Sequence, residues 1–134
     1  MRGERPTVLI VDDDFDIRLL VRVLLESAGL DVEVVGEAAD GAAALAVFDT
    51  LDPPEVPDVV ILDYHMPGKE GIEVATEMLA QEPRQQIVLF SAYVTPELEA
   101  RAQSIGVRAC VGKTDYEQLP SLVADLARRD AGTG

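Results

Sequence analysis

Three aspartates in a row follow a short apolar run, and a fourth aspartate follows a second such run further along the chain. The first three are Asp12, Asp13 and Asp14, and the fourth is Asp63. Crowded carboxylates repel one another unless a hard cation such as Mg²⁺ lies among them and takes their oxygen atoms as ligands. A carboxylate beside such a cation can act as a nucleophile.

A hydroxyl and an ammonium group follow two later apolar runs. Ser91 comes directly after residues 87–90, and Lys113 comes shortly after residues 107–111. A metal ion and a lysine together neutralise the charge of a transferring phosphoryl group, which is most of the catalytic work in this class of reaction. If the fold gathers these groups, they make a site for an acyl phosphate.

Alternating strands and helices must position these residues. Short β-branched runs are typical of strands buried on both faces, and apolar residues at helical spacing separate them. Three prolines predict a loop at residues 52–57. Strands are predicted at residues 8–11, 32–36, 59–62, 87–90 and 107–111, and helices at 17–28, at 41–48 after a cap at Asp40, at 72–79, at 96–105 after a cap at Thr95, and from Leu119 onward.

This order of elements predicts an α/β fold: a doubly wound, flavodoxin-like (βα)5 domain with a five-stranded parallel sheet in the order 2-1-3-4-5. Ligands bind such sheets beyond the carboxyl ends of the strands, beside the switch point between strands 1 and 3. Strands 1, 3, 4 and 5 would each deliver one polar group to that crevice. The second strand lies at the sheet edge, so we expect the acidic residues near it and after it to be solvated charges, namely Glu37, Asp40, Asp49 and Asp52.

The composition limits the size and the partners of the protein. The 134 residues fit one domain, and 48% of them are hydrophobic, which argues against a disordered chain. A net charge of −14 argues against direct binding of nucleic acid or of an anionic membrane surface. The single cysteine, Cys110, excludes an intramolecular disulfide. We find neither a long apolar span nor a signal peptide, and we expect a cytoplasmic protein.

The chain resembles the receiver domains of response regulators in two-component signalling over residues 6–129, which leaves residues 130–134 as a tail or the start of a linker. The resemblance is carried by VLIVDDD at 8–14, DVVILDYHMPG at 58–68 and LFSA at 89–92, with Lys113 at the position of the family's lysine. VVGEAADG at 34–41 is similar to the NarL/FixJ-type subfamily, whose members regulate transcription and usually carry a C-terminal helix-turn-helix.

The resemblance implies a metal site with Mg²⁺ or Mn²⁺ as the cofactor. Asp13, Asp63 and the backbone carbonyl of His65 would bind the ion directly, and Asp12 would bind it through water. The imidazole of His65 is expected at the rim of the pocket rather than on the metal. Three carboxylates and a carbonyl match the preference of these ions for oxygen ligands.

The resemblance also implies that Asp63 is phosphorylated by a sensor histidine kinase or a phosphotransfer protein, with the first helix in the docking surface. Ser91 would hydrogen-bond the phosphoryl group, and Lys113 would form an ion pair with it. Such a domain is not an enzyme beyond its own phosphorylation and dephosphorylation. We expect a stand-alone receiver or part of a larger regulator with a DNA-binding effector, and dimerisation on phosphorylation is a further expectation.

Two positions depart from the family pattern. Three residues before Lys113 the family usually has the aromatic ring that moves in the switch, but here Cys110 is expected to be a small buried strand residue. Tyr93 is the aromatic residue nearest to Ser91 in the sequence, and we expect it to shield the acyl phosphate. Two outcomes are open for the switch: Tyr93 takes the place of the missing ring, which we favour, or the fourth and fifth strand–helix elements respond only weakly. Thr114 replaces a proline that often forms a cis peptide, and we expect a trans bond or a reshaped loop.

Two other functions fit part of the pattern. A haloacid-dehalogenase-type phosphatase also has an Asp-x-Asp motif after its first strand, but that interpretation leaves residues 63–68 unexplained and puts Asp16 where Thr or Val is preferred. A receiver-like interaction module that works without phosphorylation is the second alternative. The complete set of site residues argues against it, and Mg²⁺ binding would test it.

Overall fold

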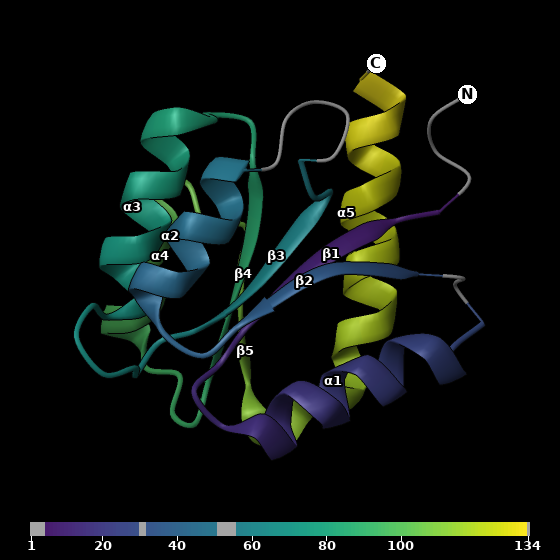
Figure 1. The fold of residues 1–134 in the computed structure, drawn as a ribbon, viewed down its shortest axis with the longest axis horizontal. Coiled ribbons are helices and arrows are strands. Elements are labelled where there is room, and N and C mark those ends of the chain that lie inside the picture. The colour runs from purple at the N-terminus through teal and green to yellow at the C-terminus, as the bar shows by residue number, and fades with distance from the viewer. Residues whose placement is uncertain (1–4, 30–31, 51–55, 134) are drawn as a thin grey trace.

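The computed structural model describes residues 5–29, 32–50 and 56–133, and in this part of the chain strands and helices alternate (Figure 1). Residues 51–55, most of the predicted proline-rich loop, lie outside it. No helix of the described part has the length and apolar character needed to cross a bilayer. The elements are β1 Thr7–Val11, α1 Phe15–Ser27, β2 Glu33–Ala38, α2 Gly41–Thr50, β3 Val59–Asp63, α3 Gly71–Gln81, β4 Gln86–Ser91, α4 Pro96–Ile105, β5 Ala109–Gly112, the 3-10 helix η1 Lys113–Gln118, and α5 Leu119–Thr133.

The five strands form one parallel sheet in the order β2-β1-β3-β4-β5, which confirms the predicted topology. The last residues of the central strands are in register: Val11 pairs with Leu62, and Asp63 pairs with Phe90. Because parallel strands run in the same direction, the residues that follow them emerge at one edge of the sheet.

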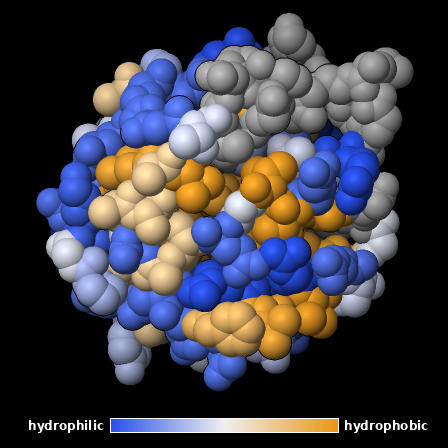
Figure 2. All heavy atoms as spheres, viewed as in Figure 1, coloured by the Kyte–Doolittle hydropathy of each residue, from blue (hydrophilic) through white to orange (hydrophobic). Residues whose placement is uncertain are grey.

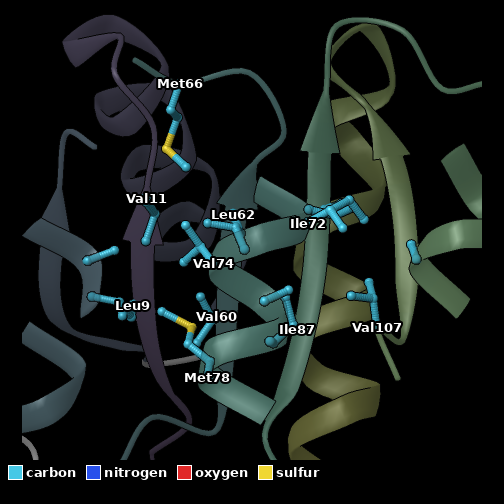
Figure 3. Packing of buried hydrophobic residues seen from close by; sticks show 14 of the residues in the cluster. Leu9, Val11, Val60, Leu62, Met66, Ile72, Val74, Met78, Ile87 and Val107 are labelled. Atoms are coloured by element: carbon cyan, nitrogen blue, oxygen red, sulfur yellow. The ribbon is translucent and has the colours of Figure 1, made fainter. Parts of the chain in front are cut away.

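Helices cover both faces of the sheet, with α2, α3 and α4 on one face and α1 and α5 on the other (Figure 1). Side chains alternate between the faces, so that Leu9 and Val11 pack under α2 and α3 while Val8 and Ile10 pack under α1 and α5. Figure 3 shows Val11, Val60 and Leu62 packed against Val74 and Met78 of α3, all of them buried. A fully buried aliphatic side chain stabilises the fold by about 1.5–3 kcal/mol. This packing holds the strands, and therefore the residues at their ends, in fixed positions.

Capping residues begin and end α4 where the sequence predicts. Thr95 accepts a hydrogen bond from the Leu98 amide at 3.1 Å, and Pro96 occupies the first turn of α4. Gly106 ends that helix with φ +105°, a left-handed conformation that favours glycine. Asp14 accepts a hydrogen bond from the Asp16 amide at 2.9 Å and caps α1. This third aspartate of the run is therefore a helix cap.

Several boundaries differ from the prediction. β5 begins at Ala109 rather than at 107, because the Val107 amide still donates to the Ala102 carbonyl at the end of α4. β2 continues to Ala38, two residues beyond the predicted end. The 3-10 helix η1, which directly follows β5, is not predicted from the sequence. α5 continues through Thr133, so the segment separated as a tail at residue 130 is helical up to that point.

Candidate functional site

Three carboxylates meet beyond the ends of β1 and β3. One oxygen each from Asp12, Asp13 and Asp63 lies within 4.8 Å of the others. Asp12 and Asp63 are buried, whereas Asp13 is exposed and leaves the group open to solvent. The structure therefore brings together the three carboxylates that the sequence predicts as metal ligands.

Lys113, directly after β5, reaches into this group and contacts both buried carboxylates. Its Nζ lies 2.9 Å from Asp12 Oδ2 and 3.2 Å from Asp63 Oδ1. Burial by itself lowers the pKa of the Lys113 ammonium, but the contacts with Asp12 and then with Asp63 outweigh burial and raise that pKa above its usual value. Lys113 therefore stays charged at neutral pH.

The charge of the group is only partly balanced by this lysine. Burial, followed by repulsion from Asp12, raises the pKa of the Asp63 carboxyl to about 6, and Lys113 opposes the rise. Asp13 adds a smaller repulsion in the same direction. Asp63 is still mostly ionised at neutral pH. Its ionised form is destabilised by burial and by the neighbouring carboxylates, and a further positive charge nearby would stabilise it.

The donor set fits a divalent cation that prefers oxygen ligands. Asp12 Oδ1 accepts a hydrogen bond from the Asp14 amide at 2.9 Å, whereas its buried Oδ2 faces Lys113 and accepts no hydrogen bond of good geometry. An all-oxygen set suits Mg²⁺ or Mn²⁺ and lacks the nitrogen and sulfur ligands typical of zinc sites. Among the described residues the cluster of ligand atoms does not include the His65 imidazole, which is exposed, 3.9 Å from Glu70.

Ser91 ends β4 beside this group, and its hydroxyl is engaged by its own loop. The Oγ donates to the backbone carbonyl of Tyr93 at 3.1 Å and accepts from the Tyr93 amide at 3.3 Å. The Tyr93 side chain is 82% exposed. A ring this exposed does not fill the space behind Ser91, so the expected role in the switch requires the ring to move.

Cys110 is a small, half-buried strand residue, close to what the sequence predicts. It lines a cavity of about 330 Å³ between α4 and β5, together with residues that include Glu99 and Arg108. Burial, reinforced by Glu99, raises the pKa of its thiol. The thiol is therefore neutral and a poor nucleophile at physiological pH.

Gly71, the first residue of α3, has a role that sequence analysis missed. Its amide donates to the Tyr64 carbonyl at 2.7 Å, and a Cβ at this position would lie 2.4 Å from the Asp63 carbonyl oxygen and 2.9 Å from the Tyr64 Cα. Any side chain here would displace the backbone that carries Asp63. The only sequence signal is a glycine at the start of a helix soon after the acidic strand.

Glu37 is not a solvated charge, and that prediction is wrong. Its carboxylate accepts hydrogen bonds from Arg18 Nε at 3.0 Å and from Arg22. Arg22 in the first place, and then Arg18, lower the pKa of this carboxyl against the opposing effect of burial. Arg18 also donates through Nη1 to the backbone carbonyl of Asp12 at 2.7 Å. Glu37 thus connects indirectly with the acidic cluster. Asp40, by contrast, caps α2 as predicted, accepting from the Ala43 amide at 2.7 Å.

Comparison with known proteins identifies the class to which this fold and this set of side chains belong. The family model for the response regulator receiver domain matches residues 8–124, and the chain belongs to this family. Its five-stranded order also matches a CheY-like receiver domain from Methanospirillum hungatei, with a TM-score of 0.82 at 23% identity.

Named relatives show which kinds of protein contain similar receiver domains. The probable transcriptional regulatory protein NarL of Mycobacterium tuberculosis is 38% identical over 126 residues, which are 93% of this chain and 56% of that protein. The solved receiver domain of the putative NarL from the same organism has a TM-score of 0.79 at 34% identity and covers 92% of this chain and 97% of that one. A protein-glutamate methylesterase/protein-glutamine glutaminase of Nocardioides is 37% identical over 90% of this chain and 31% of its own length. The chain thus spans from 31% to 56% of the length of these two curated relatives.

Proposed function

We propose that this receiver domain takes up a phosphoryl group on Asp63 and later releases it by hydrolysis. The observation that carries the proposal is the position of Lys113 between the buried carboxylates of Asp12 and Asp63, at the open end of the parallel sheet. A carboxylate oxygen of Asp63 attacks phosphorus, and the bond from phosphorus to the donor's leaving group breaks. Water later attacks the same phosphorus, which restores the carboxylate and yields inorganic phosphate.

The residues around Asp63 have two roles: some bind the metal ion, and others contact the phosphoryl group. Asp13, Asp63 and the backbone carbonyl of His65 would hold Mg²⁺ or Mn²⁺, and Asp12 would hold it through water. The cation would supply positive charge that offsets the negative charge of the phosphoryl group. Lys113 exchanges its contact with Asp63 for an ion pair with a phosphoryl oxygen. Ser91 turns from the Tyr93 carbonyl and donates to another phosphoryl oxygen.

The phosphodonor is a sensor histidine kinase or a phosphotransfer protein that docks on α1. Phe15, Leu19 and Val23 lie four residues apart along this helix and are all exposed, with Phe15 at 63%. Figure 2 shows the resulting apolar strip over α1, close to the end of β1 that carries the acidic cluster. A regulator containing this domain would pass the phosphorylation signal to a DNA-binding effector, through dimerisation of the receiver, and the similarity to a probable transcriptional regulatory protein supports this output. The domain itself catalyses no other reaction.

Phosphorylation by a small donor tests the proposal directly. Incubation with acetyl phosphate and Mg²⁺ should add one phosphoryl group of about 80 Da to the wild type, seen by intact mass spectrometry. Asp63→Asn should stay unlabelled, and Asp49→Asn, a matched change of an exposed aspartate on α2, should be labelled like the wild type. Equal labelling of Asp63→Asn would contradict the assignment. A folded wild type that binds Mg²⁺ and takes up no phosphoryl group would favour the phosphorylation-independent module.

A further inference from the structure

We infer that Arg18, held in place by Glu37, is a positioning residue that fixes the backbone of Asp12 and thereby the acidic cluster. The inference rests on the proposed function, because it assigns a purpose to a contact on the metal and phosphoryl site. Arg18 touches neither the phosphoryl group nor the metal in this account. It acts through the peptide group that carries Asp12.

The contacts of Arg18 connect three elements of the fold. From α1 it donates through Nη1 to the Asp12 carbonyl at 2.7 Å, just beyond β1, and through Nε to Glu37 Oε1 at 3.0 Å, on β2. The Arg18 side chain is only 15% exposed. The planar guanidinium holds these two donors in a fixed geometry, so that its bond to Glu37 also sets its bond to Asp12.

The sheet register explains why Glu37 is available for this role. A shift in the pairing of β1 with β2 between Val8 and Leu9 places Glu37 opposite Ile10. Ile10 belongs to the core under α1 and α5. Neighbouring residues of paired strands point to the same face of a sheet, so Glu37 faces α1. Without the shift Glu37 would pair with Val11 and face the opposite side.

Both backbone polar groups of Asp12 are tied to the β2 side of the sheet. Its amide donates to the Ala38 carbonyl at 3.0 Å, and its carbonyl accepts from Arg18. The carboxylates of Asp12, Asp13 and Asp63 repel one another, so other contacts must hold the turn after β1 in one position. The two backbone hydrogen bonds fix the position and orientation of the Asp12 peptide groups, from which its carboxylate projects. A charge-assisted hydrogen bond such as the one from Arg18 is about twice as strong as a neutral one.

Arg18 also contacts Phe15, which belongs to the exposed surface of α1 proposed as the docking site. Its guanidinium carbon lies 5.6 Å from the centre of the Phe15 ring, within cation–π range. A band of hydrophilic side chains lies between α1 and β2 in Figure 2, directly beside the apolar strip over α1. Arg18 is thus in contact both with the exposed Phe15 and with the peptide group of Asp12.

Arg22 offers a matched control one helical turn further along α1. It donates to the same carboxylate, with Nε 3.1 Å from Glu37 Oε2, but none of its recorded hydrogen bonds reaches Asp12. Removing Arg22 therefore takes away a comparable ion pair of Glu37 and leaves the Arg18–Asp12 bond in place. An effect of equal size in the Arg18 and Arg22 variants would come from losing an ion pair with Glu37, and not from losing the bond to Asp12.

The test combines Mg²⁺ titration with amide hydrogen exchange in the full chain. The amide of Asp14 is the reporter, because it donates to Asp12 Oδ1 at 2.9 Å and senses the position of that carboxylate without any metal. In Arg18→Met the Mg²⁺ Kd should rise about tenfold, the lower end of what outer ligand-shell changes cost, and exchange at Asp14 should quicken. Glu37→Gln should give a smaller change in the same direction. Arg22→Met should stay within about twofold of the wild type.

The outcomes separate this inference from the proposed function. If Arg18→Met keeps wild-type Mg²⁺ affinity and Asp14 protection, or if Arg22→Met weakens both as strongly, the positioning role is wrong. If Arg18→Met does not fold, the Mg²⁺ Kd and the amide exchange at Asp14 are measured in Arg18→Lys and Glu37→Gln instead, and these values test the positioning role. A lysine cannot hold both partners in one planar fork, so Arg18→Lys should lie between wild type and Arg18→Met. A wild type without phosphorylation overturns the proposed function alone, since exchange at Asp14 is measured without metal or phosphodonor.

Discussion

Lys113 Nζ lies 3.2 Å from Asp63 Oδ1, although the two residues follow strands that are not neighbours in the sheet. The lysine spans the end of β4 to reach the proposed phosphoacceptor. It also contacts Asp12, so one positive charge serves two buried carboxylates. Burial, followed by repulsion from Asp12, raises the pKa of Asp63 to about 6, and the shared lysine offsets this rise only in part. The site is therefore organised around a charge that the protein alone does not balance.

The raised pKa predicts that Asp63 destabilises the metal-free protein at neutral pH. Its folded pKa of about 6 lies above the ordinary 3.8, so the stability linked to its protonated form is full below about pH 4 and is lost as the pH rises through 6. In EDTA, Asp63→Asn should be more stable than wild type at pH 7, by at most about 3 kcal/mol. Urea unfolding at pH 4 and pH 7 measures the difference, which should vanish at the lower pH. A variant that is less stable than wild type at pH 7 would refute this account.

Removing the lysine should leave two buried carboxylates without their cation. Lys113→Gln should destabilise the metal-free protein at pH 7 by about 3 kcal/mol, as expected when one partner of a buried ion pair is lost. Lys69→Gln is the control, because Lys69 pairs with Glu77 on the surface and should contribute less than about 1 kcal/mol. Urea midpoints of both variants provide the comparison. Added Mg²⁺ should recover part of the loss in Lys113→Gln and none in Lys69→Gln.

Gly71 should be required for the position of Asp63. In Gly71→Ala the new Cβ would lie 2.4 Å from the Asp63 carbonyl oxygen, and the helix or the strand end must move. We expect a loss of about 1–3 kcal/mol in stability and weaker Mg²⁺ binding. Gly29→Ala is the control: with φ +74° and no atom within 4 Å, it introduces backbone strain away from the site. It should lower the urea midpoint without changing the Mg²⁺ titration, whereas unchanged Mg²⁺ binding in Gly71→Ala would contradict the prediction.

The sequence predicts the part of the site that depends on strand ends alone. Asp12 and Lys113 directly follow β1 and β5, and Asp63 and Ser91 are the last residues of β3 and β4, so the topology is enough to gather them. Their spacing in the sequence carries this information because the backbone, and not a particular side-chain conformation, decides where they emerge. The same reasoning predicts the sheet order, and it places the helix boundaries within two residues of those observed.

The contacts that sequence analysis missed depend on details finer than topology. Glu37 faces α1 only because the β1–β2 pairing shifts near Val8, and nothing in the alternation of residues 32–38 indicates that shift. The role of Gly71 depends on the path of the loop after β3, which brings the start of α3 onto the Asp63 backbone. The two errors therefore have one cause. A local pattern of residue types does not specify an irregular register or a loop path.

The last prediction concerns how phosphorylation reaches the loop after β4. Two mechanisms make opposite predictions for Tyr93→Ala. If the Tyr93 ring replaces the missing switch aromatic near Cys110, the variant should lose the response. The recorded contacts favour a second mechanism, because Ser91 Oγ binds the backbone carbonyl and amide of Tyr93, and both groups survive the substitution. A hydroxyl that turns to a phosphoryl oxygen must break these two bonds and release the loop backbone.

Beryllium fluoride with Mg²⁺, which imitates a phosphoryl group on Asp63, allows the two mechanisms to be compared by amide chemical shifts across residues 91–112. We expect Tyr93→Ala to respond like the wild type and Ser91→Ala to lose the shifts at residues 92–94, because a ligand biases only an element that it contacts differently in the two states. The 82% exposure of the Tyr93 side chain agrees with this expectation, since its ring has no packing to exchange. A full response in Ser91→Ala together with a lost response in Tyr93→Ala would instead make the ring, and not the hydroxyl, the moving part of the switch.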